Sequence, residues 1–101
     1  MDNKHVSIAK EKIRDFCRRW NIVEFGLFGS VLREDFHQDS DVDVLVTFAP
    51  DSHHSLVDLV RMEEELGEIF GRKVEVVEKS ALRNPFRRHA ILSSVEVVYA
   101  T

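Results

Sequence analysis

Asp41 and Asp43 are the residues of this sequence best suited to chemistry, because a single residue separates them and the apolar run Val44–Val46 follows. In an extended strand alternate side chains point to the same face, so both carboxylates would share one surface, with Cα atoms roughly 6.6 Å apart. Such a pair can converge on one or two cations and repels itself without them. The alternative is a strand whose water-facing side simply begins with two acids.

Gly29 and Ser30 lie ten residues before this pair, after the alternating segment 22–28 and before residues 31–33, which suit the first turn of a short helix. A strand, a small-residue turn and a helix start form an anion site, because backbone N–H groups and the positive end of the helix dipole face outward there. The plainer interpretation is a turn glycine followed by an ordinary N-cap. A phosphate site beside two carboxylates is what a magnesium–nucleotide complex needs.

The apolar pattern predicts the elements that position these groups. Asn3 could cap a first helix whose apolar stripe runs to Trp20. The full expected order is helix, strand (22–28), short helix, strand (41–48), helix (55–71), strand (73–78), helix (84–92) and closing strand (95–99), the last one at a sheet edge. This order predicts an α+β fold with a small mixed β-sheet, helices packed mainly on one face and the acidic site on the other.

Local signals mark the ends of the later helices. Ser55 and Asp58 resemble a capping pair, Gly71 can end the same helix, and Asn84 with Pro85 is a good helix start.

Glu75 is a third candidate carboxylate. In the strand 73–78 it points away from Val74 and Val76, so it would reach the two aspartates if its strand neighbours theirs. Periodicity alone favours an ordinary surface glutamate.

Other polar and reactive side chains have simpler interpretations. Cys17 lies on an apolar helical stripe and is expected in the core, while His37, His53 and His54 are expected to be exposed in polar loops. A solvated helix face is expected for the acids Glu63, Glu64, Glu65 and Glu68. The basic residues near the C-terminus, such as Arg87 and Arg88, could be solubilising surface or could contact a triphosphate or an acidic partner.

Length and composition limit the possibilities. We expect 101 residues with 44% hydrophobic content to form a single domain, 1–101, with one core. A net charge of −4 argues against direct binding to nucleic acid through phosphate contacts. One cysteine excludes a disulfide framework, and the absence of a signal-peptide pattern or a long apolar run predicts a cytoplasmic protein that does not enter a membrane.

The Gly29-Ser30 pair, the ten intervening residues and Asp41-Val42-Asp43 resemble the signature of the polymerase-β-like nucleotidyltransferase superfamily. The short chain is similar to the minimal nucleotidyltransferase branch along nearly its whole length, including Arg33 and the strand with Glu75. It differs at Glu34, where a glycine is common, and at Glu75, where aspartate is more usual.

The resemblance implies a nucleotidyltransferase fold and magnesium-dependent nucleotidyl transfer from ATP. Gly29, Ser30 and Arg33 would bind the nucleotide, and Asp41, Asp43 and Glu75 would be the catalytic and metal-binding residues, holding two Mg²⁺ ions. Glu75 would be the third ligand, the base that deprotonates the acceptor, or both.

Minimal nucleotidyltransferases resemble one half of two-component systems whose other half is a helical HEPN-domain ribonuclease toxin. The resemblance therefore implies an antitoxin that transfers AMP to a hydroxyl of such a toxin and can form an oligomer with it. Two alternatives stay open: transfer to a small-molecule hydroxyl, and a non-catalytic antitoxin that acts by binding.

Overall fold

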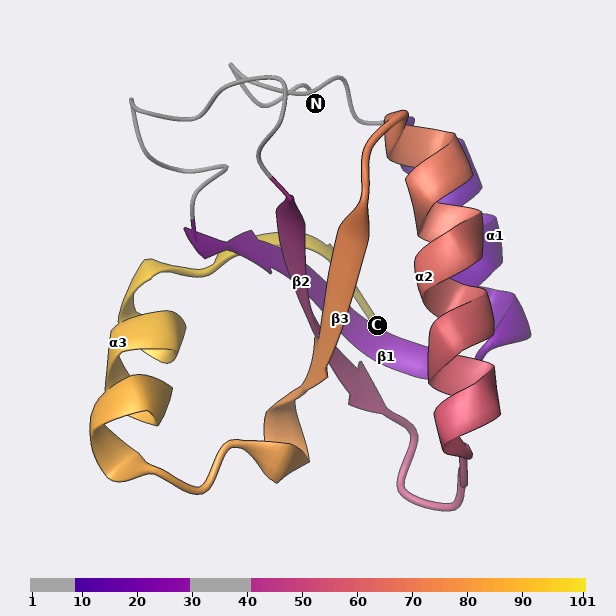
Figure 1. Cartoon of the computed structure of the whole chain (residues 1–101). Helices are drawn as coiled ribbons and strands as arrows, with labels where there is room; N and C mark the ends of the chain where they lie inside the picture. Colours follow the sequence, from indigo (N-terminus) through magenta and orange to yellow (C-terminus); the bar gives the residue numbers. More distant parts are fainter. Residues whose placement is uncertain (1–8, 30–40) are drawn as a thin grey trace.

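The computed structural model describes residues 9–29 and 41–101, and the elements below belong to these residues (Figure 1). They are α1 (Lys10–Arg19), β1 (Ile22–Phe28), β2 (Val42–Phe48), α2 (Leu56–Phe70), β3 (Val74–Glu78), the short 3-10 helix η2 (Lys79–Ala81), α3 (Pro85–Ser94) and β4 (Glu96–Ala100). Apart from η2, which was not predicted, this order matches the predicted one within the described residues. The short helix predicted after Ser30, the cap Asn3 and the loop residue His37 lie outside the described residues.

The strands form one mixed sheet in the order β3-β2-β1-β4. β2 and β3 are parallel and are joined by the crossover helix α2, a connection that parallel neighbours need, whereas β1 is antiparallel to both β2 and β4. The predicted α+β fold with a mixed sheet is therefore confirmed, and the strand that follows Asp41 lies at its centre.

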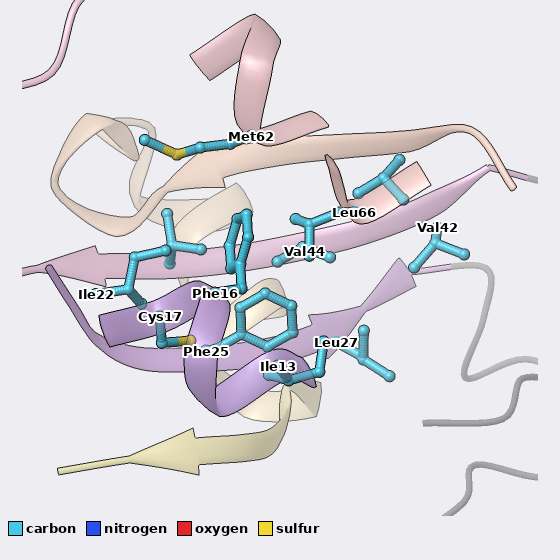
Figure 2. Close-up of a cluster of buried hydrophobic side chains, with 12 residues drawn as sticks. Ile13, Phe16, Cys17, Ile22, Phe25, Leu27, Val42, Val44, Met62 and Leu66 are labelled. Atoms are coloured by element: carbon cyan, nitrogen blue, oxygen red, sulfur yellow. The ribbon is translucent and has the colours of Figure 1, made fainter. Parts of the chain in front are cut away.

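Two helices cover one face of this sheet. Phe16 of α1 and Met62 of α2 pack with the inward residues of β1 and β2, among them Phe25 and Val44, and all four side chains are fully buried (Figure 2). The phenyl rings of Phe16 and Phe25 meet edge to face, with centroids 6.2 Å apart. Cys17 belongs to the same cluster, as predicted, and burial raises the pKa of its thiol to about 12.

The opposite face carries a smaller cluster in which Phe28 and Leu45 meet Leu82, which follows η2, and Ile91 of α3. Figure 1 shows α3 on the other side of the sheet from α1 and α2. The helices therefore lie mainly, but not wholly, on one face.

The predicted helix ends are confirmed. Ser55 and Asp58 form a reciprocal capping box at the start of α2, and Gly71 ends this helix in the left-handed conformation. Asn84 accepts hydrogen bonds from the N–H groups of Phe86 and Arg87 at the start of α3. The first helix differs, because α1 begins at Lys10 after Ala9 without a side-chain cap.

Two expectations about polar residues were wrong. His54 is not an exposed loop residue: its side chain is only 10% exposed, and its ring packs against Phe48 at 4.3 Å and Trp20 at 5.9 Å between centroids. The acids of α2 are not a uniformly solvated face either. Glu65 accepts hydrogen bonds from Trp20 and Arg19, and Glu63 accepts one from the backbone N–H of Val76.

No helix in the described part of the chain is long and apolar enough to cross a membrane.

Candidate functional site

Asp43 is the second residue of β2, and its side chain points away from the main core. Its neighbours Val42 and Val44 are fully buried beneath α1 and α2, so the alternation of the strand directs the half-buried Asp43 to the opposite face. Asp41 is exposed and stands immediately before the strand, where the N–H of Val42 donates to the carbonyl oxygen of Lys73 at 2.9 Å.

Glu75 lies beside Asp43. The register of the parallel pair matches Asp43 with Glu75, and residues matched in adjacent strands direct their side chains to the same face. The condition under which Glu75 could reach Asp43, that their strands are neighbours, is therefore met. On its other side Asp43 is matched with Phe28, the last residue of β1.

Gly29 follows Phe28 directly and closes the site from the β1 side. Its φ is +78°, and a Cβ atom added there would collide with Oδ2 of Asp43. A Cβ atom at this position would therefore displace the Asp43 carboxylate, and glycine adopts the positive φ without the strain that other residues would carry. The structure thus brings together Gly29, Asp43 and Glu75, whereas Ser30 and Arg33 lie outside the described residues.

The described residues, 9–29 and 41–101, contain no group of three or more His, Cys, Asp or Glu side chains arranged to hold a metal ion. The three-carboxylate ligand set of Asp41, Asp43 and Glu75 therefore stays a prediction. Mg²⁺ does not require such a set, because it binds through one or two carboxylates together with phosphate oxygens and water. The adjacent carboxylates of Asp43 and Glu75 fit that requirement.

The basic residues near the C-terminus divide into two kinds. Arg88 is half-buried, and its guanidinium donates to the carbonyl oxygens of Lys79 at 3.2 Å and Leu82 at 3.5 Å. Lys79 in turn lies 3.5 Å from the carboxylate of Glu24. Arg88 thus ties α3 to η2, whereas Arg87 is exposed.

No local sequence pattern indicates the contact between Glu63 and the backbone of β3. Glu63 sits among other acids on a helix, and its partner Val76 is 13 residues away. Only the crossover from α2 to β3 places the two together.

Residues 9–98 match the nucleotidyltransferase domain family, and the chain belongs to this family. It is a nucleotidyltransferase.

Among the relatives, the chain is 36% identical to the protein adenylyltransferase MntA of Thermococcus cleftensis, over 92% of its own length and 89% of that protein. Two solved structures share the fold. One is a toxin–antitoxin with AMP-PNP, with a TM-score of 0.74, 17% identity, and coverage of 93% of this chain and 75% of that one. The other is a tri-AMPylated HEPN toxin of Shewanella oneidensis in complex with its MNT antitoxin, with a TM-score of 0.65, 16% identity, and coverage of 91% and 70%.

Proposed function

We propose that this protein is an antitoxin that transfers AMP from ATP to a hydroxyl group of a HEPN-type ribonuclease toxin and so neutralises it. The observation that carries the proposal is the juxtaposition of Gly29, Asp43 and Glu75 on one end of the sheet. Support comes from the relative named protein adenylyltransferase, which aligns over nearly the whole chain.

The transfer is an in-line displacement at the α-phosphorus of ATP. The acceptor oxygen forms a bond to this phosphorus while the bond to the β-phosphate bridging oxygen breaks, so AMP is joined to the acceptor and pyrophosphate leaves. Bound Mg²⁺ supplies charge neutralisation on the triphosphate. Asp41 and Asp43 would hold one or two such ions, with Glu75 as a third ligand.

Gly29 and Glu75 serve the two ends of this reaction. Gly29 lets the triphosphate approach the backbone closely, and Ser30 and Arg33 would add donors to its phosphate oxygens. Glu75 accepts the proton from the acceptor hydroxyl, which raises the nucleophilicity of the oxygen as it attacks.

The test is incubation of the protein with labelled ATP, Mg²⁺ and a HEPN-domain toxin protein, followed by mass spectrometry of that toxin. We expect a mass increase of one or more AMP units, absent with Asp43→Asn. If the Asp43→Asn protein inhibits the unmodified toxin equally well, neutralisation occurs by binding. Label on a small molecule instead would show a different acceptor.

A further inference from the structure

Glu63 makes a contact between α2 and the strand that carries Glu75. Its side chain is half-buried, and its Oε2 atom accepts a hydrogen bond of 2.9 Å from the backbone N–H of Val76. Hydrogen bonds to an ionised carboxylate are roughly twice as strong as neutral ones, so this contact is a firm attachment point.

The strand β3 needs such an attachment because it is an edge strand, paired only with β2 within the described sheet. In a parallel ladder, alternate residues of an edge strand direct their backbone groups toward the neighbour and the intervening ones direct theirs outward. The carbonyl of Lys73 bonds to β2, whereas the N–H of Val76 is turned outward to Glu63. The outer side of β3 is thus held by a side chain of α2.

Val76 follows Glu75 directly, and the two share one planar peptide unit. Fixing the nitrogen of this unit restrains the ψ angle of Glu75 and with it the direction in which the Glu75 side chain leaves the strand. Glu75 itself is exposed.

We propose that Glu63 is a positioning residue that holds β3 so that the Glu75 carboxylate faces Asp43. The inference rests on the proposed catalytic role of Glu75. Glu63 does not touch substrate, and it acts only through the strand.

Two substitutions separate this role from a general effect of charge. Glu63→Ala removes the acceptor, whereas Glu63→Gln keeps an acceptor oxygen at the same distance from the backbone. We expect kcat for AMP transfer to fall about tenfold or more in Glu63→Ala with KM for ATP unchanged, and Glu63→Gln to retain most of the rate. Glu68→Ala, an exposed acid on the same helix, is the matched control and should behave as wild type.

A double-mutant cycle gives the decisive result. If Glu63 acts through Glu75, then Glu63→Ala should cause little further loss in a Glu75→Gln background. Fully additive losses would mean that Glu63 supports the fold at large, and would overturn the proposal.

Amide exchange without nucleotide keeps this test apart from the proposed function. We expect two quantities to change in Glu63→Ala and to stay unchanged in Glu68→Ala. One is the rate of amide exchange at Val76, and the other is the broadening of the Glu75 amide signal by added Mn²⁺. Unchanged exchange and broadening would refute the positioning role even in a protein that modifies no toxin. Conversely, a wild-type protein that shows the expected NMR changes but transfers no AMP would refute only the proposed function.

Discussion

Gly29 is subject to two constraints at once, and a second glycine of the chain allows them to be separated. Gly29 and Gly71 both have positive φ, at +78° and +69°. A Cβ atom at Gly29 would also collide with Asp43, whereas one at Gly71 would meet no atom within 4 Å. Substitution of either glycine would therefore strain the backbone, but only substitution of Gly29 would also displace the Asp43 carboxylate.

We therefore predict that Gly29→Ala and Gly71→Ala each lose about 1 kcal/mol of folding free energy, since alanine is strained at positive φ. Only Gly29→Ala should also lower AMP transfer strongly, by about a hundredfold, because it displaces the Asp43 carboxylate. Chemical denaturation and transfer kinetics measure the two effects. Equal activity of the two variants would show that Gly29 is a turn residue and nothing more.

Glu75 and Glu78 provide the second residue-scale comparison. Both are acids of β3, but they point to opposite faces because three positions separate them. Glu75→Gln should lower transfer by about a hundredfold if Glu75 is the general base, whereas Glu78→Gln should change it little. The metal-free fold of Glu75→Gln should be at least as stable as wild type, because a like-charge pair with Asp43 is relieved. Small and equal effects of the two substitutions on the rate would show that Glu75 is an ordinary surface residue without a catalytic role.

At the scale of elements, Glu65 joins the two helices that cover the main core. Its carboxylate accepts hydrogen bonds from Nε1 of Trp20 at 2.8 Å and from the guanidinium of Arg19. Arg19 is the last residue of α1, and Trp20 follows it. We predict that Glu65→Ala lowers the unfolding free energy by about 1–2 kcal/mol, because the partly buried indole N–H loses its acceptor. The exposed neighbour Glu64 is the control.

AMP transfer by the folded Glu65→Ala protein should stay near that of wild type. Glu65 lies on the face of the sheet that α1 and α2 cover, whereas Asp43 points to the opposite face. A thermal shift assay run beside the transfer assay separates the two properties. A large loss of AMP transfer at unchanged stability would show that the contact between α1 and α2 influences the candidate site.

Sequence reasoning succeeded at this scale where the partners are close in the chain. Ser55 and Asp58 are three residues apart, and Asn84 binds the N–H groups two and three residues ahead, so both helix starts are encoded locally. Glu65 and Trp20 are 45 residues apart, and His54 meets Trp20 across 34 residues. No local pattern predicts these contacts, and the acids and the histidine were wrongly expected to be solvated.

The candidate site was likewise predictable only where it depends on residues that are close together in the chain. Alternation placed Asp43 on a face opposite Val42 and Val44, but nothing in the alternation says which strand lies next to it. The placement of Glu75 beside Asp43 depended on the order β3-β2-β1-β4, which is a property of the assembled sheet.

At the scale of the whole molecule, the exposed cation Arg87 is available to a partner protein, and its neighbour Arg88 is engaged within the fold. We predict that Arg87→Glu weakens the complex with an acidic surface of the toxin, most strongly at low salt, where exposed charges are least screened. Titration calorimetry at two salt concentrations measures this.

Arg88→Gln provides the contrast, since it should lower thermal stability by removing the attachment of α3 to Lys79 and Leu82. Affinity that is independent of salt for both wild type and Arg87→Glu would exclude Arg87 from the docking surface.

Trp20 is the only tryptophan of the chain, and its surroundings make it an optical reporter of one end of the molecule. Its indole contacts His54, whose ring lies against Phe48 at the last position of β2, whereas Asp43 stands near the first, roughly 17 Å away along the strand. Intrinsic fluorescence therefore follows the separation of α1 from α2 as the protein unfolds and remains insensitive to what occupies the distant carboxylates. A change in emission on adding a toxin would instead report contact near Trp20 and His54.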